Sequence, residues 1–260
     1  MRAKIGASYN LFDGEELLES SILSIRDSVD FISVVYQTQS NLGNPCNPQL
    51  TDLLLKLRKD KLVDEVAHYN PDLSKSAPDN EIIKRNIGLI LSTENKCTHH
   101  LSIDTDELYE KDQFEYAKKA IIQEDYDSSV CRLYTYYKND YTILDPMEDY
   151  YVPFLYKIRK GFFFESIQFP VLVDPTRRMP AGRLIEFNPN ELIMHHYSYV
   201  RKDMRMKLEN SSAKTNFTEE MIENIINHYE IWQPGVDALI APNRYFQTKT
   251  IEPKFRLWQG

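Results

Sequence analysis

Two aspartates, Asp104 and Asp106, form the strongest chemical signal in the sequence. They follow the apolar residues 99–103, which predict a buried strand, and lie in the turn that ends it. Because the alternation of side chains along a strand relaxes in a turn, both carboxylates can converge on one site. Mg²⁺ and Mn²⁺ prefer such oxygen ligands and keep positions open for a diphosphate. A solvated acidic turn is the alternative, and we favour it for a second pair, Asp125 and Asp127.

A pair of basic residues lies about one strand upstream, in the predicted helix 82–91. Lys84 and Arg85 come early in this helix, where the helix dipole disfavours cations unless an anion faces them. A diphosphate is one such anion. A surface salt bridge between Arg85 and Glu81 explains the sequence equally well, so both interpretations stay open.

Adjacent histidines form a third candidate, His195 and His196 in the predicted strand 192–200. Neighbouring residues of a strand point to opposite faces, so at most one of the two rings faces a given site. A lone histidine is more often a hydrogen-bonded structural residue than a metal ligand. A partner side chain is therefore needed before either ring is assigned to a metal.

The elements that must position these residues alternate between strand and helix. The predicted strands are 4–9, 31–36, 62–67 and 99–103, and the predicted helices are 18–25, 50–57 and 82–91. This order indicates βαβ units and an α/β fold with a mostly parallel central sheet flanked by helices. Ligands of such sheets bind at the carboxyl ends of the strands. We therefore expect the site at Tyr9-Asn10, Tyr36-Gln37 and Asp104–Asp106.

The pattern changes beyond residue 125. Residues 129–137, 151–159 and 192–200 predict aromatic-rich strands, and residues 221–229 predict a late amphipathic helix. We expect one domain over residues 1–203, with a nucleotide-binding half at 1–110 and an acceptor half at 111–203. Residues 204–260 are then expected to form a helical extension.

Composition excludes several classes of protein. The net charge is −8 and the pI is about 5.3, which argues against a nucleic-acid binder. No apolar run approaches the roughly 20 residues that cross a bilayer. The first residues show no signal peptide, so we expect a cytoplasmic protein without a transmembrane segment, and contact with a membrane surface stays open. The three cysteines are widely spaced and predict neither a zinc site nor a disulfide.

Taken in order, these pieces resemble glycosyltransferases of the GT-A fold, especially family-2-like members. The resemblance rests on Tyr9-Asn10 after the first strand, Lys84-Arg85-Asn86 in a helix, and Asp104-Thr105-Asp106 closing a strand. Residues 196–201 are similar to the His-Tyr-Gly-Trp-Val-Arg segment of some members. The resemblance covers approximately residues 3–203. Its specificity comes from the joint presence and the order of all four pieces.

The resemblance implies a Rossmann-related nucleotide-binding half and a metal-dependent transfer of sugar. The donor would be a UDP- or GDP-sugar, the acceptor a hydroxyl of a glycan or glycoconjugate, and the cofactor Mn²⁺ or Mg²⁺. Asp104, Asp106 and His196 would bind the metal. The residues that would contact the nucleotide sugar are Tyr9, Asn10, Gln37, Lys84, Arg85, Asn86 and Asp104.

The chain also departs from this family. Many relatives carry an acidic residue after the second strand, whereas Gln37 stands in a neutral segment here. The Gln-x-x-Arg-Trp string of processive members is absent from the sequence, which argues against a polymerising synthase. An inverting reaction needs a carboxylate to take the acceptor proton. Glu148 and Asp149 are the candidates, with an exposed acidic loop as the alternative, and a retaining reaction would need no such base.

Two other functions remain as alternatives. A sugar nucleotidyltransferase usually has a Gly-rich basic loop after the first strand, whereas residues 10–16 contain one glycine and no basic residue. A non-catalytic carbohydrate- or protein-binding module could use the same fold. Metal dependence of nucleotide binding would separate such a module from an enzyme.

Overall fold

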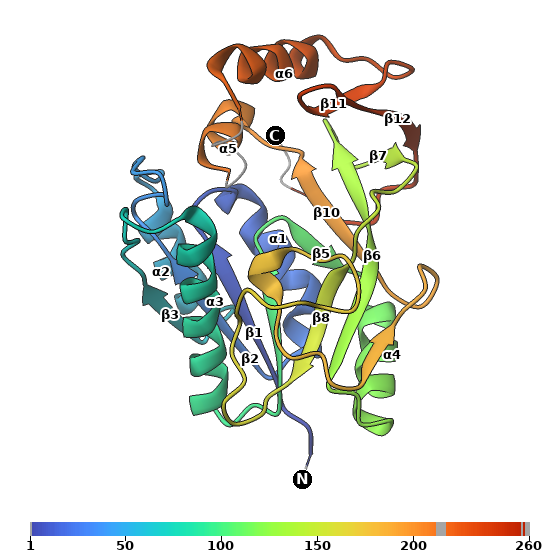
Figure 1. The fold of residues 1–260 in the computed structure, drawn as a ribbon. Coiled ribbons are helices and arrows are strands. Elements are labelled where there is room, and N and C mark those ends of the chain that lie inside the picture. Colours follow the sequence, from blue (N-terminus) through green and yellow to red (C-terminus); the bar gives the residue numbers. More distant parts are fainter. Residues whose placement is uncertain (1, 212–216, 256, 258–260) are drawn as a thin grey trace.

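The computed structural model describes residues 2–211, 217–255 and 257. It shows an α/β fold built around one large sheet with helices on its faces (Figure 1). The strands are β1 (Ile5–Leu11), β2 (Phe31–Tyr36), β3 (Glu65–His68), β4 (His99–Asp104), β5 (Glu107–Tyr109), β6 (Ser128–Tyr137), β7 (Thr142–Asp145), β8 (Val152–Lys157), β9 (Leu184–Glu186), β10 (Ile193–Tyr199), β11 (Ala238–Ala241) and β12 (Arg244–Thr250). The helices are α1 (Glu15–Ile25), α2 (Leu50–Lys59), α3 (Ala77–Glu94), α4 (Lys111–Gln123), α5 (Met204–Asn210) and α6 (Glu219–Ile231), with 3₁₀ turns η1 (Arg26–Ser28) and η2 (Pro175–Arg177).

The parallel part of the sheet is confirmed. Strands β3, β2, β1 and β4 run side by side, with Tyr9 opposite Val34 on one side and Ile103 on the other. Strand β1 is buried along its whole length because layers of helices cover both faces. It is flanked by β2 and β4, so the strand order reverses there, and a ligand is expected at that reversal.

The expectation of a mostly parallel sheet is wrong, because the sheet is mixed. Strand β8 runs antiparallel to both β4 and β6, and β7 runs antiparallel to β6 and β12. The reason lies in the connections. Only residues 138–141 join β6 to β7, and a parallel neighbour requires a crossover of a dozen or more residues.

Helix α3 lies directly on β1 and β2 and carries the predicted basic residues. Ser76 begins the helix by accepting a hydrogen bond from the backbone N–H of Asp79 at 3.2 Å. Gly88 allows close contact with the sheet, since a Cβ there would stand 2.0 Å from the Ser8 Oγ. This close packing fixes the first turns of α3 beside the carboxyl end of β1.

The C-terminal segment packs on the far end of the sheet, away from the N-terminus (Figure 1). It was expected to be helical, but besides α5 and α6 it contains the hairpin β11–β12, which joins the sheet through β7. Its apolar residues, among them Ile222 and Trp232, form a cluster with Tyr137 and Leu144. Within the described ranges, no helix combines the length and the apolar character that a membrane span requires.

Candidate functional site

A cleft of about 400 Å³ opens at the carboxyl ends of β1, β2 and β4. Helix α3 forms one wall, and residues from the end of β10 through α5 form another. The predicted positions that line the cleft are Asn10, Gln37, Lys84, Asp104, Asp106 and His196. The expectation that the strand ends converge on one site is therefore supported by the geometry.

The acidic turn meets the histidine strand inside this cleft. After β4, Thr105 and Asp106 make a short turn into β5, which pairs antiparallel with β10 so that Glu107 lies opposite His196. The backbone N–H of Tyr197 donates to the carbonyl of Asp106 at 2.8 Å. As a result, the His196 Nε2 lies 3.6 Å from the Asp106 Oδ2, although ninety positions of sequence separate them.

Asp106 is buried among positive charges. Its Oδ2 accepts a hydrogen bond from the Arg201 guanidinium and lies 3.9 Å from the Lys207 Nζ. Burial disfavours the charged carboxylate, but Arg201, His196 and Lys207 outweigh it and hold the pKa of Asp106 below its ordinary value. Burial also lowers the pKa of His196, so its ring is neutral and can offer a lone pair.

Asp104 is bound by two arginines. The Arg85 Nη2 lies 3.2 Å from the Asp104 Oδ1, and Arg177 of η2 reaches the other oxygen. Burial opposes ionisation of Asp104, yet the two guanidiniums hold its pKa well below the usual range. Arg85 also lies 3.5 Å from Glu81, so the predicted salt bridge exists, but Arg85 is buried at the site and not on the surface.

Amides and an amine line the other side of the cleft. The Lys84 Nζ donates to the Gln37 Oε1, and the Gln37 Nε2 donates to the Asn41 Oδ1 at 2.8 Å. Burial lowers the pKa of Lys84. Asn10 is only 7% exposed, and neither its Oδ1 nor its Nδ2 has a hydrogen-bond partner. A buried amide without partners is costly unless a ligand or water satisfies it.

Three predicted nucleotide contacts do not line the cleft: Arg85, which lies behind Asp104, and Tyr9 and Asn86. Tyr9 is in the core, and its hydroxyl hydrogen-bonds the Ser21 Oγ at 3.0 Å. Because neighbours on a strand point to opposite faces, Asn10 can face the cleft only if Tyr9 faces α1. Asn86 instead holds a loop: its Nδ2 donates to the Phe164 carbonyl at 2.9 Å and its Oδ1 accepts from the Phe164 N–H at 2.8 Å.

The two candidate bases lie outside the lining of the cleft. Glu148 is buried, its Oε1 accepts from the Thr135 Oγ1 at 2.7 Å, and its Oε2 lies 3.1 Å from Arg244 of β12. Asp149 is fully exposed and lies 3.3 Å from Arg132. The exposed-loop interpretation therefore describes Asp149, whereas Glu148 is a buried carboxylate paired with a half-exposed arginine.

Sequence reasoning missed several residues that shape the site. Arg201 belongs to the segment 196–201 that resembles the family, but its residue type alone indicates no role at the site. Arg177 lies in the short 3₁₀ turn η2, and Lys207 lies in α5, which begins directly after the expected end of the domain at residue 203. Asp13 was also missed, although it directly follows the first strand and lines the cleft.

The second acidic pair is a surface feature, as expected. Asp125 pairs with Lys157, and Asp127 pairs with Arg159. Asp125 has a positive φ of 56°, which is typical of a turn residue. His195 behaves as strand alternation predicts, because it points away from His196 and its Nδ1 bonds the Tyr136 hydroxyl at 2.7 Å.

Two of the three predicted metal ligands, Asp106 and His196, lie together in the cleft. Among residues 2–211, 217–255 and 257, no three His, Cys, Asp or Glu side chains are grouped closely enough to hold a metal ion. Asp106 and His196 nevertheless provide an anionic oxygen and a neutral nitrogen in contact range. Mg²⁺ is often held by one or two protein ligands together with substrate phosphates, so this pair fits such an ion, whereas Asp104 faces its two arginines.

Comparisons with known proteins give matches only among solved structures. No protein-family model matches the chain, and no curated protein matches it. S. aureus TarS 1–349 in complex with UDP-GlcNAc is 14% identical, with a TM-score of 0.39, and the match covers 51% of this chain and 35% of that one. GalNAc-T7 with UDP, GalNAc and Mn²⁺ is 13% identical, with a TM-score of 0.39, over 51% of this chain and 23% of that one.

The chain spans about a third of the TarS 1–349 structure, since 36% of that chain is covered. Because these matches are partial and distant, the function proposed below rests on the geometry of the site.

Proposed function

We propose that this chain is a metal-dependent glycosyltransferase that moves a sugar from a nucleotide diphosphate donor to a hydroxyl of a glycan or glycoconjugate. The observation that carries the proposal is the 3.6 Å contact between Asp106 and His196 in a cleft at the carboxyl edge of the sheet. The surrounding cations, Lys84, Arg201 and Lys207, suit a donor that carries two phosphates.

The charged residues would act on the leaving group. When the sugar departs, negative charge develops on the diphosphate, and fixed cations in a partly buried cleft stabilise that charge. Arg201 and Lys207 stand beside Asp106 and would contact the phosphates. Asp106 and His196 would hold Mn²⁺ or Mg²⁺, which supplies further neutralisation of the diphosphate.

The amides would recognise the nucleotide. Asn10 presents an unpaired acceptor and an unpaired donor, and Gln37 and Asn41 form a second polar group on the same side of the cleft. The edge of a uracil or a guanine offers matching donors and acceptors, so a UDP- or GDP-sugar is the proposed donor. Asp104, held by Arg85 and Arg177, would form the floor between nucleotide and sugar.

Glu148 is the better of the two proposed bases. It is buried near the His196 strand, because its partner Thr135 lies opposite His196 in the sheet. To accept a proton it must give up the contact with Arg244. Asp149 points to solvent and would need a larger movement. We therefore place the acceptor half, residues 111–203, around Glu148.

A non-catalytic binding module is the second candidate, and one observation favours it. Both Asp104 and Asp106 are already paired with arginines, as they would be in a protein that uses them to stabilise its fold. Such a module would bind nucleotide weakly or without dependence on metal. Titration of UDP and GDP with and without Mn²⁺ distinguishes the two candidates.

The proposal is tested with Asp106→Asn, and the second acidic pair offers a matched control, Asp125→Asn. Isothermal titration with UDP and Mn²⁺ and release of nucleotide from UDP- and GDP-sugars are measured for each protein. We expect Asp106→Asn to lose at least tenfold in affinity, about 1.4 kcal/mol, and to lose turnover, while Asp125→Asn matches the wild type. Equal values for Asp106→Asn and the wild type would overturn the proposal.

A further inference from the structure

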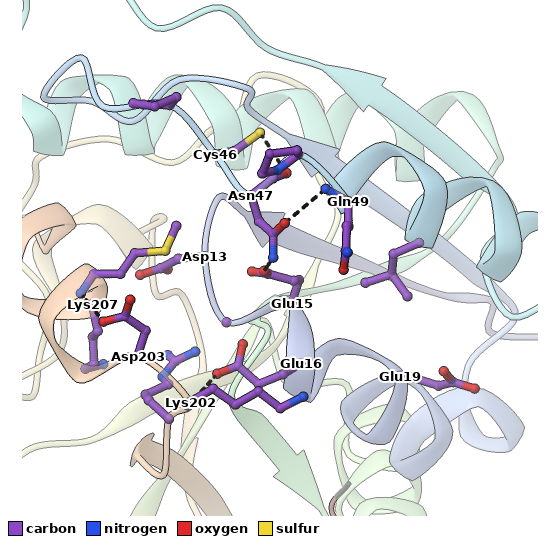
Figure 2. Close-up of a pocket in the computed structure, with 16 residues that line it drawn as sticks. Asp13, Glu15, Glu16, Glu19, Cys46, Asn47, Gln49, Lys202, Asp203 and Lys207 are labelled. Carbon is purple, nitrogen blue, oxygen red and sulfur yellow. Dashed lines mark hydrogen bonds between the residues drawn. The ribbon is translucent and has the colours of Figure 1, made fainter. Parts of the chain in front are cut away.

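A second cleft of about 600 Å³ lies beside the first (Figure 2). It is formed by the start of α1, the residues before α2 and the start of α5. Asp13, Arg201 and Lys207 line both clefts, so the two clefts adjoin at these side chains. Figure 2 shows Asp13 and Lys207 on the side of this cleft opposite Gln49.

The lining combines carboxylates with apolar surface. Glu15 and Glu16 are anchored by hydrogen bonds from the Asn47 Nδ2 at 2.6 Å and from the backbone N–H of Lys202 at 3.1 Å. Apolar atoms come from residues such as Leu53 and from Met206, Pro45 and Pro48. Fixed carboxylate oxygens accept hydrogen bonds from hydroxyl groups, and apolar surface covers the C–H faces of a sugar ring.

The acidic lining also indicates what the cleft rejects. Asp13, Glu15, Glu16, Glu19 and Asp203 outnumber the basic residues Arg201, Lys202 and Lys207. A second phosphate-rich or carboxylate-rich ligand would meet net repulsion there, whereas a neutral or amine-bearing one would not. In the first cleft, by contrast, Asp104 and Asp106 are each paired with an arginine, and Lys84 and Lys207 add further positive charge.

A buried donor group lies in the wall between the clefts. The Arg201 side chain is 5% exposed and binds Asp106 through Nη2, but its Nη1 is buried without a hydrogen-bond partner. This Nη1 lies against Gly14, which also lines the second cleft. A buried guanidinium nitrogen without a partner is costly, and an oxygen of a bound ligand would satisfy it.

From these features we infer that the second cleft binds the acceptor as a neutral or amino sugar. This inference rests on the proposed function, because it takes the first cleft as the donor site. The acceptor hydroxyl would then extend past Asp13, which lines both clefts, toward the diphosphate region and the proposed base Glu148. The volume of the cleft falls in the usual range of small-ligand sites, about 300–1,000 Å³.

The test uses saturation-transfer NMR on the full chain with UDP and Mn²⁺ present. The probes are maltose, lactose and N,N′-diacetylchitobiose, and an unsaturated chondroitin disaccharide serves as an acidic comparison. Gln49→Trp fills the cleft from its exposed rim. Leu55→Trp is the matched control, since Leu55 is 62% exposed on α2, the helix that begins directly after Gln49, and is not part of the lining.

We expect at least one neutral disaccharide to bind the wild type and Leu55→Trp, at least tenfold weaker binding to Gln49→Trp, and no binding of the acidic disaccharide. Undiminished binding to Gln49→Trp, or no neutral disaccharide bound at all, would overturn the inference. UDP titrations on the same three proteins report on the first cleft. A wild type that binds no UDP refutes the proposed function instead, so the two failures are distinguishable.

Discussion

Replacing Gly14 with alanine should damage the site through Arg201. Gly14 has a φ of 71°, in the left-handed region, and an added Cβ would stand 1.7 Å from the Arg201 Nη1. The backbone conformation costs a non-glycine residue about 1 kcal/mol. The clash forces Arg201 away from Asp106, and a hydrogen bond between charged groups is worth about 2 kcal/mol. The combined loss is then about 3 kcal/mol.

Gly235 supplies the matched control for this prediction. Its φ is 94°, and nothing lies within 4 Å of an added Cβ, so Gly235→Ala carries the backbone cost without a clash. A loss of 1 kcal/mol lowers the melting midpoint of a chain of this size by roughly 2–4 °C. We therefore expect a fall of roughly 6–12 °C for Gly14→Ala and roughly 2–4 °C for Gly235→Ala, measured by circular dichroism.

UDP binding in the presence of Mn²⁺ completes the comparison. Because Asp106 loses its guanidinium partner only in Gly14→Ala, only that variant should bind UDP more weakly. Equal melting midpoints and equal affinities in the two alanine variants would refute the argument that Gly14 makes room for Arg201.

Three further changes test other parts of the structure. Tyr9→Phe removes the hydrogen bond to Ser21, so unfolding free energy should fall by about 1 kcal/mol while UDP affinity stays unchanged; a large loss of affinity would restore Tyr9 to the nucleotide site. Burial lowers the pKa of His99 to about 4, so the unfolded chain binds more protons than the folded chain between pH 4 and 6.5. The free energy of unfolding therefore falls on acidification across that range, and urea titrations should show a smaller fall for His99→Gln. Glu148→Gln should abolish transfer but preserve UDP binding, and retained transfer would exclude Glu148 as the base.

Much of the site follows from the order of strands, because parallel strands end at one edge. Asp104, Gln37 and Asn10 each follow a strand with a clear apolar pattern, and their meeting needs no further information. The alternation of side chains also separates His196, which faces Asp106, from His195, which does not. For the same reason, Asn10 and Tyr9 could not both have faced the cleft.

Contacts made by irregular segments could not be predicted. Arg177 reaches Asp104 from a loop without periodic pattern, and Arg244 reaches Glu148 from a strand in a region that was expected to be helical. An aromatic-rich segment predicts a strand, but its sequence does not show whether that strand runs parallel or antiparallel to its neighbours. Their neighbours in the sheet depend on tertiary packing, so the mixed character of the sheet emerges only from the structure.

The pairing of β12 with β7 has a consequence for synthesis of the chain. Thr248 lies opposite Leu144, so the outer part of the sheet cannot form until residues about a hundred positions further along the chain have been synthesised. Contacts of such long sequence separation close slowly. While the ribosome still holds this hairpin, the backbone edge of β7 stays open to other chains, and aggregation is most expected during that interval.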